Sequence, residues 1–144
     1  MKHLFFNAIA VFLLFGATAS YGQEKKAIDF SALPQTAQDF VNQYFSAKEV
    51  STVFYDSDDR EYEVRFSDGS KIEFDKKGSW EEIEDRDNVP AAVMPQPIND
   101  FLATHHKNAK VLKISHDRKG YEVELLGDIE LKFNKKGKFQ RYDD

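Results

Sequence analysis

The sequence predicts an α+β protein built as a tandem repeat, in which a helix is followed by an antiparallel meander of three or four strands. Two observations lead to this prediction. A series of short motifs recurs in the same order after roughly 60 residues, which indicates an internal repeat. Within each recurrence, apolar residues at helical spacing precede segments in which apolar and charged residues alternate. Because alternating strands bury only one face, we expect each helix to pack on one sheet face.

Residues 1–22 have the pattern of a secretory signal peptide. A basic start is followed by an apolar run from Leu4 to Phe15 and then by small residues. This run is too short to span a bilayer, which takes about 20 apolar residues as a helix. Ser20 and Gly22 favour cleavage after Gly22, and cleavage after Ala19 is the alternative. We therefore expect an exported protein, periplasmic or extracellular, with no membrane anchor after cleavage.

Residues 23–144 are expected to form a single domain that contains the two repeats, at about 32–84 and 92–142. The matching motifs are Leu33-Pro34-Gln35 with Met94-Pro95-Gln96, Asp39-Phe40 with Asp100-Phe101, Tyr62-Glu63-Val64 with Tyr121-Glu122-Val123, and Phe74-Asp75-Lys76-Lys77-Gly78 with Phe133-Asn134-Lys135-Lys136-Gly137. Two extra residues in the first copy, within 56–59, account for the change in offset along the chain. One gap in a turn explains all of these matches.

Each copy opens with a helix. Pro34 and Pro95 suit a first helical position, where a missing N–H costs nothing. The apolar stripes are Leu33, Ala37, Phe40, Val41 and Tyr44 in the first copy, and Met94, Ile98, Phe101, Leu102 and His105 in the second. Helices this short are marginal alone, so we expect the stripes to pack on the sheet.

The alternating segments that follow each helix predict the strands. We expect strands at 50–55, 62–66 and 71–74 in the first copy and at 111–116, 121–125 and 129–133 in the second. A last strand starts near Trp80 and near Phe139. The Lys-Lys-Gly sequences that end at Gly78 and Gly137 predict hairpin turns with a positive φ at glycine. The acidic stretch 81–87 is expected to link the copies.

These motifs resemble the PepSY-like family, whose tandem members are described as similar to the β-lactamase inhibitor protein. The resemblance rests on the Leu-Pro or Met-Pro helix start, the Asp-Phe pair, the Tyr-Glu-Val strand and the Lys-Lys-Gly turn, over about residues 32–142. It implies a helix against an antiparallel sheet in an exported protein of Gram-negative envelopes. It also implies a role in binding or inhibiting enzymes, particularly peptidases, without catalytic residues to carry over.

Composition excludes several classes of function. The chain has no cysteine, which excludes disulfide scaffolds, thiol catalysis and Cys-ligated zinc. Its formal net charge of −5 argues against a nucleic-acid partner, because nucleic-acid binding needs a basic face. No G-x-S-x-G, Walker, G-x-G-x-x-G or H-E-x-x-H motif is present. We therefore expect no enzyme, no catalytic residue and no cofactor.

Two groups of residues have the chemistry of metal ligands. His105, His106 and His116 carry imidazoles, but the repeat places all three where the first copy has an aromatic residue. Segment 56–61 is rich in carboxylates, but Arg60 takes a ligand position and the glycine of a calcium loop is missing. We expect no metal site, and a divalent-cation binder is the weaker alternative.

A partner surface is expected on the sheet face that the helices leave free. Alternation assigns to it Thr52, Phe54, Glu63, Arg65, Glu73, Lys113, Ser115, Glu122, Glu124 and Lys132. Phe54 is the aromatic residue of this polar set, and Trp80 is placed beside it as a second anchor. Packing of both aromatics under the linker or between the repeats is an equal alternative.

The function that best fits these residues is a secreted or periplasmic, non-enzymatic binding module. Its partner would be a protein, and the module would inhibit or regulate an envelope enzyme such as a peptidase. A structural or stress-related envelope protein without a dedicated enzyme partner is the alternative. The sequence leaves the oligomeric state open.

Overall fold

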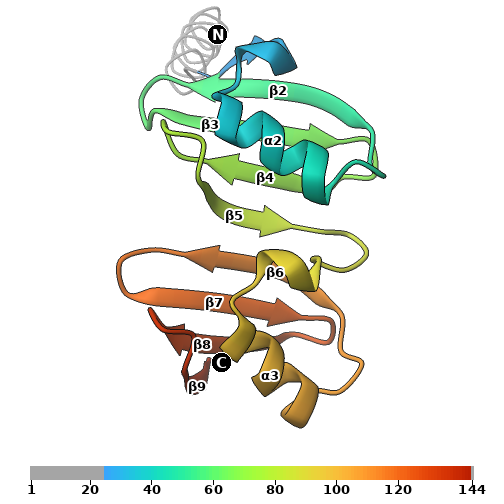
Figure 1. The fold of residues 1–144 in the computed structure, drawn as a ribbon, viewed down its shortest axis with the longest axis vertical. Helices are drawn as coiled ribbons and strands as arrows, with labels where there is room; N and C mark the ends of the chain where they lie inside the picture. The colour runs from blue at the N-terminus through green and yellow to red at the C-terminus, as the bar shows by residue number, and fades with distance from the viewer. Residues whose placement is uncertain (1–24, 144) are drawn as a thin grey trace, which may run out of the picture.

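The computed structural model describes residues 25–143, and the predicted signal peptide lies outside them. The described chain is an α+β fold with a nine-stranded antiparallel sheet, whose strands follow one another in chain order from β1 to β9. Figure 1 shows the strands running across the view, with both α-helices on the near side of the sheet. No helix within residues 25–143 is long and apolar enough to cross a membrane.

The order of elements is nearly the same in the two halves of the chain. The N-terminal half, residues 25–84, contains β1 (Lys25–Ile28), the short 3-10 helix η2 (Phe30–Ala32), α2 (Gln35–Tyr44), β2 (Val50–Asp56), β3 (Glu61–Phe66), β4 (Lys71–Phe74) and β5 (Trp80–Glu84). The C-terminal half, residues 91–143, contains η3 (Ala91–Val93), α3 (Gln96–His105), β6 (Val111–His116), β7 (Gly120–Leu125), β8 (Ile129–Asn134) and β9 (Phe139–Asp143). The halves join where β5 pairs with β6.

The strands differ from the prediction in two places. The expected three or four strands per copy omit β1, which pairs with β2 so that Ala27 lies opposite Phe54. Its four residues show no clear alternation, and the strand forms because β2 offers it an unpaired edge. The predicted acidic link at 81–87 is also wrong in part, because residues 81–84 belong to β5.

The helices begin one residue later than predicted. Pro34 and Pro95 occupy the N-cap positions, and α2 and α3 start at Gln35 and Gln96. The prolines therefore precede the helices, with extended backbone (ψ 142° and 141°), rather than forming their first residues.

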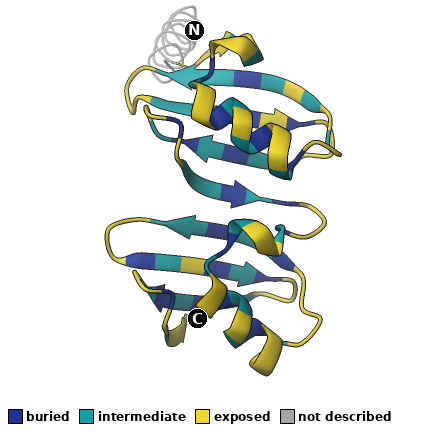
Figure 2. Cartoon of the chain, in the orientation of Figure 1, coloured by how far each residue is buried: buried dark blue, intermediate teal, exposed yellow. Residues whose placement is uncertain are grey.

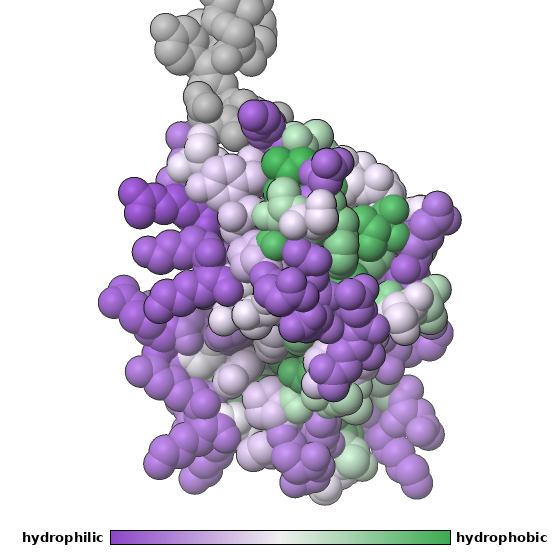
Figure 3. Space-filling view, turned by 45° about the horizontal axis from the view of Figure 1, so that its top comes forward, coloured by the Kyte–Doolittle hydropathy of each residue, from purple (hydrophilic) through white to green (hydrophobic). Residues whose placement is uncertain are grey.

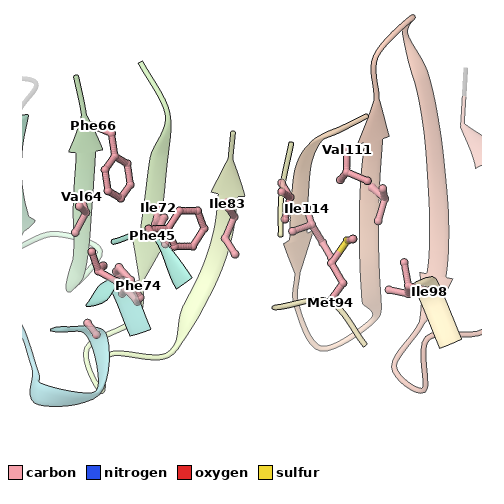
Figure 4. Packing of buried hydrophobic residues seen from close by; sticks show 14 of the residues in the cluster. Phe45, Val64, Phe66, Ile72, Phe74, Ile83, Met94, Ile98, Val111 and Ile114 are labelled. Carbon is pink, nitrogen blue, oxygen red and sulfur yellow. The ribbon is translucent and has the colours of Figure 1, made fainter. Parts of the chain in front are cut away.

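The core lies between the sheet and the helices. Ala37 and Val41 of α2 and Ile98 and Leu102 of α3 are buried. Figure 2 shows short dark blue segments on otherwise exposed or half-buried helices. The sheet contributes Val53, Val64, Phe66, Ile72, Phe74, Ile83, Val111, Ile114, Val123, Leu125, Leu131 and Phe133. Figure 4 shows the apolar side chains of the two halves as two groups, with Ile83 and Ile114 on their facing sides. These two residues pair where β5 meets β6.

The hairpin turns press against the helix starts. Gly78 has a φ of 86°, and a Cβ there would lie 2.9 Å from the Cβ of Pro34 and 3.0 Å from the backbone nitrogen of Ala37. Gly137 has a φ of 78° in the C-terminal half, where a Cβ would lie 3.3 Å from Pro97. Glycine is thus required at Gly78 both by the backbone angle and by the close contact with α2.

β5 and β9 each contain a bulge. The register shifts at the Glu73/Phe74 step opposite β5 and at the Lys132/Phe133 step opposite β9. A bulge places two residues of one strand opposite one residue of the other and changes which side chains share a face. Alternation from Trp80 or Phe139 onward therefore predicts the wrong face for the residues beyond the bulge.

Candidate functional site: the open face of the sheet

Among residues 25–143, the sheet face opposite α2 and α3 has no covering element (Figure 1). Paired residues of neighbouring antiparallel strands point to the same side, so the side chains of this face form two rows across the sheet. We call these side chains the open face. The rows are Phe54, Glu63, Glu73, Glu82, Ser115, Glu122, Lys132 and Arg141, and Thr52, Arg65, Lys71, Glu84, Lys113, Glu124, Glu130 and Asp143.

The structure brings together all the predicted site residues except Trp80. Phe54, Glu63, Arg65, Glu73, Lys113, Glu122, Glu124 and Lys132 lie on the open face. Trp80 pairs with Phe74, whose ring meets Phe40 of α2 edge-on at 5.8 Å, so Trp80 lies on the helix side. The expected position of Trp80 beside Phe54 is wrong because of the bulge in β5. The role of the open face in binding a partner stays a prediction.

The alternation of apolar and charged residues did not predict the open-face residues that β5 and β9 contribute. These are Glu82 and Glu84 from β5, and Arg141 and Asp143 from β9. Both strands carry a bulge, and neither shows a clean alternation of apolar and charged residues. The acidic residues of Trp80–Glu84 could have indicated this contribution, because acidic side chains beside a predicted strand are expected on a sheet face that no helix covers.

Phe54 is the aromatic residue of the open face, and it is half-buried. The guanidinium carbon of Arg65 lies 4.8 Å from the centre of the Phe54 ring, in the arrangement of a cation–π contact. Beside the ring is a hollow of about 260 Å³ that Lys25, Glu61 and Glu73 help to line. An aromatic ring under an exposed arginine is a common anchor in protein interfaces.

Glu63 differs from the other carboxylates of the open face because its exposed fraction is only 5%. Lys25 of β1 donates to its Oε2 at 2.8 Å, and Arg65 donates to its Oε1. Burial disfavours the charged carboxylate, but the hydrogen bonds from Lys25 and Arg65 outweigh it and hold the pKa of Glu63 below its usual range. Glu63 therefore holds β1 to the sheet and supports Arg65, rather than being free to meet a partner.

Two lysines flank the acids of β5 on the open face, and one of them, Lys113, links the two halves. Lys71 of β4 lies 3.4 Å from Glu73, 4.0 Å from Glu82 and 3.8 Å from Glu84. Lys113 of β6 approaches the same two β5 residues, Glu82 and Glu84, at 3.5 and 3.6 Å. Burial opposes the charge of Lys113, yet these carboxylates raise its pKa above the ordinary value. The negative charges of Glu82 and Glu84 are thus neutralised by a lysine from each of the two strands that neighbour β5.

Carboxylates gather at one end of the open face, near the β2–β3 turn. Partial burial, and then the charges of Glu81, Glu73 and Asp59, raise the pKa of Glu61 to about 7. Glu81 is the extra residue of the β5 bulge, which brings it toward Glu61. Because its pKa lies near 7, Glu61 is about half ionised at neutral pH, and an external cation would relieve the repulsion between its carboxylate and that of Glu81.

On the helix side, Trp80 lines a shallow groove between α2 and the C-terminal half. The groove has a volume of about 600 Å³, and its apolar walls include Phe40, Tyr44 and Val93. The His116 ring stands edge-on to the Trp80 indole at 4.5 Å, and its Nε2 donates to the Trp80 carbonyl at 2.6 Å. Figure 3 shows apolar patches on this side of the molecule, near its N-terminal half, surrounded by hydrophilic side chains.

The two histidines at the C-terminal end of α3 contact aromatic side chains. His105 is exposed, against the expectation that it belongs to the buried stripe, and its ring lies 4.3 Å from that of Phe101. His106 Nε2 lies 2.9 Å from the Tyr142 hydroxyl. Within residues 25–143, no group of three or more His, Cys, Asp or Glu side chains is placed to hold a metal ion.

The fold and this site define a class: small α+β proteins in which helices cover one face of an antiparallel sheet and the other face is broad and charged. A family model described as "Putative beta-lactamase-inhibitor-like, PepSY-like" matches residues 17–64 and 60–141. The chain belongs to this PepSY-like family, as the resemblance of its motifs implies.

Solved structures of Bacteroides proteins are similar over nearly their whole length. A "putative calcium-regulated periplasmic protein" from Bacteroides thetaiotaomicron is 42% identical, with a TM-score of 0.81 over 84% of this chain and 98% of that one. A "putative periplasmic protein from DUF2874 family" from Bacteroides vulgatus is 38% identical, with a TM-score of 0.79 over 84% and 98%. A further periplasmic protein of unknown function from Bacteroides vulgatus is 30% identical, with a TM-score of 0.77 over 83% and 99%. No curated protein matches the chain. Like these relatives, the protein is exported to the periplasm.

Proposed function

We propose that this protein is a non-enzymatic binding module that docks a protein partner on its open face, and that it inhibits or regulates an envelope enzyme such as a peptidase. The observation that carries the proposal is the open face itself, a charged sheet surface that crosses both halves and contains the Phe54–Arg65 pair. The inhibitor-like description of the family supports the same function.

The chemistry of the open face favours a protein as the occupant. Basic and acidic side chains alternate across strands β4, β5 and β6, where Lys71 and Lys113 flank Glu82 and Glu84. Mixed charges of this kind raise the rate at which a partner associates and discriminate between partners. An aromatic ring that loses its water on binding contributes most of the affinity. Arg65 already stacks on Phe54, so a partner that covers the pair meets an ordered anchor.

The test uses residues 23–144 as bait in periplasmic extract, followed by an affinity measurement on the captured protein. We expect the double variant Phe54→Ala/Arg65→Ala to weaken binding by about tenfold or more, as loss of an interface anchor does. Trp80→Ala is the matched control, because it removes an aromatic ring from the opposite side of the sheet. If the captured protein is an enzyme, its activity should fall when the module is added in excess.

Two results would refute the proposal. If Trp80→Ala weakens binding while Phe54→Ala/Arg65→Ala does not, the partner occupies the helix-side groove. If no protein is captured at all, the proposal fails and the alternative of a structural or stress-related envelope protein gains support. Circular dichroism of each variant shows whether a loss of binding comes from a loss of fold.

A second candidate function is a response to calcium. One relative is described as calcium-regulated, and in this chain Glu61 and Glu81 are a carboxylate pair whose repulsion a divalent cation would relieve. Because no three such ligands within residues 25–143 are placed to hold a metal, binding would require these side chains to turn. We expect Ca²⁺, but not equal Mg²⁺, to raise the melting temperature of the wild type and to leave that of Glu61→Gln/Glu81→Gln unchanged. An unshifted wild type would refute this candidate.

We also propose that residues 23–144 form one domain made of two repeats, each with its helix packed on its own part of the sheet. The matched bulges opposite β5 and β9 support this proposal, as do the register shifts at Val50/Thr52 and Val111/Lys113. A single cooperative unfolding transition, seen equally by fluorescence and by circular dichroism, is the expected result. Two separate transitions would indicate two independent domains.

A further inference from the structure

β9 ends the sheet with an unpaired outer edge. Among residues 25–143 no strand pairs with that edge, and Figure 1 places it at the end of the sheet away from β1. β5 holds the corresponding place in the N-terminal half, and there the same edge pairs with β6. An unpaired edge leaves a row of backbone N–H and C=O groups ready to accept another strand.

Tyr142 marks the position where a neighbouring strand is missing. It lies opposite Leu131 on β8, as Ile83 lies opposite Ile72 on β4. Ile83 has an exposed fraction of 0%, because Ile114 of β6 pairs with it, whereas Tyr142 is 50% exposed. Of the large apolar side chains within residues 25–143, only Tyr142 and Leu126 are exposed to this extent.

The residues on either side of Tyr142 are complementary to each other in charge. Arg141 and Asp143 both point to the open face, opposite Lys132 and Glu130. If β9 meets β9 of a second copy in antiparallel register with Tyr142 on the two-fold axis, Arg141 of each chain lies opposite Asp143 of the other. The two Tyr142 rings then meet on the helix side. Each chain therefore contributes the same strand, β9, to a symmetric (isologous) contact.

We propose that the protein self-associates through the outer edge of β9, so that two nine-stranded sheets join into one about a two-fold axis. Within the chain, Asp143 already lies 3.2 Å from Lys132 and 3.6 Å from Arg141. These pairs are solvent-exposed and contribute little, so exchanging them for pairs with a second copy costs little. The contact is small, and dimers of this kind form at high protein concentration only. This inference is independent of the binding function proposed for the open face.

The test is analytical ultracentrifugation of residues 23–144 at low salt, up to about 1 mM protein, the range in which weak association is seen. We expect a concentration-dependent dimer. Arg141→Asp places Asp opposite Asp143 of the second copy, and Asp143→Arg places Arg opposite Arg141. Each variant alone should therefore dimerise about tenfold more weakly than the wild type.

Mixing the two variants is the decisive experiment. In a heterodimer of Arg141→Asp with Asp143→Arg, both cross-strand pairs have opposite charges again, so the mixture should associate about as well as the wild type. Tyr142→Ser should weaken dimerisation, whereas Leu126→Ser, at the other exposed apolar residue, should not. A wild type that stays monomeric at every concentration would overturn the proposal. So would a mixture that associates no better than its separate, folded components.

Discussion

Glu63 and Glu122 occupy the same position in the two Tyr-Glu-Val strands, yet their environments differ. The side chain of Glu63 is 6% exposed and that of Glu122 is 63% exposed. Glu63 accepts hydrogen bonds from Lys25 and Arg65, whereas Glu122 has one ion pair, with Lys132 at 3.1 Å. One motif therefore sets the strand and the face in both halves, while the neighbouring strands decide whether the carboxylate supports the fold or remains available for binding.

A second difference between the halves lies on the helix side. Phe139 of β9 stacks on Phe101 of α3, with ring centres 4.3 Å apart and planes at 17°. Trp80 holds the equivalent place in β5 but packs edge-on against His116 of the next half. In the C-terminal half, α3 thus packs on the last strand of the same half. The last strand of the N-terminal half contacts its neighbour and leaves a groove next to α2.

The largest expected effect concerns the difference between Glu63 and Glu122. Glu63→Ala removes the acceptor of two charge-assisted hydrogen bonds, each worth about 1.5–3 kcal/mol, so it should cost about 3–5 kcal/mol of unfolding free energy. Glu122→Ala removes an exposed pair and should cost about 1 kcal/mol or less. Urea unfolding of both variants measures the difference. Equal losses would mean that β1 does not hold Glu63 as described.

The next effect concerns the two helices. Phe40 and Phe101 are half-buried, and replacing either with alanine should cost about 2–4 kcal/mol. Phe101→Ala should be the more destabilising, because it also loses the stack with Phe139, and aromatic pairs add about 1 kcal/mol. Thermal and urea unfolding provide the values. A near-neutral effect at both positions would contradict the packing of the helices on the sheet.

A smaller effect depends on pH and separates Glu61 from Glu63. The pKa of Glu61 is raised to about 7, so its contribution to stability is present below its unfolded pKa and is lost as the pH rises through 7. Glu61→Gln should therefore match the wild type near pH 4 and exceed its stability at pH 8, by about 1–2 kcal/mol after allowance for solvent screening. Glu63 has the opposite sign, because its lowered pKa makes its contribution disappear as the pH falls. Unfolding curves measured across this pH range test both.

The smallest expected effect concerns the equivalent residues Trp80 of β5 and Phe139 of β9. Trp80→Phe gives β5 the residue that β9 has, and it should change stability by about 1 kcal/mol or less, because Trp80 is only half-buried. Phe139→Trp is the reverse change, and it should cost more because the ring would have to enter a packed stack with Phe101 and Phe133. Tryptophan fluorescence reports the environment in both variants. A large loss in Trp80→Phe with none in Phe139→Trp would reverse this comparison.

Most of the open face could be predicted because its strands alternate cleanly. In Tyr62–Phe66 and Tyr121–Leu125 every second residue is apolar, and pairing places the others on one face whatever the partner strand is. Trp80 was misplaced because a bulge, which depends on how β5 meets β4, interrupts the alternation. The burial of Glu63 escaped prediction for a related reason, since Lys25 reaches it from a strand of four residues without a pattern of its own.

The sequence by itself determined the α+β class, the two helices and the face to which the residues of the regular strands belong, because local spacing controls these properties. The tertiary structure alone decided that β1 would complete the sheet, that Trp80 would turn toward His116, and that identical Tyr-Glu-Val strands would hold one buried and one exposed carboxylate. These outcomes depend on which strands become neighbours. Side chains distant in sequence then set burial and charge at each position, and no local pattern encodes them.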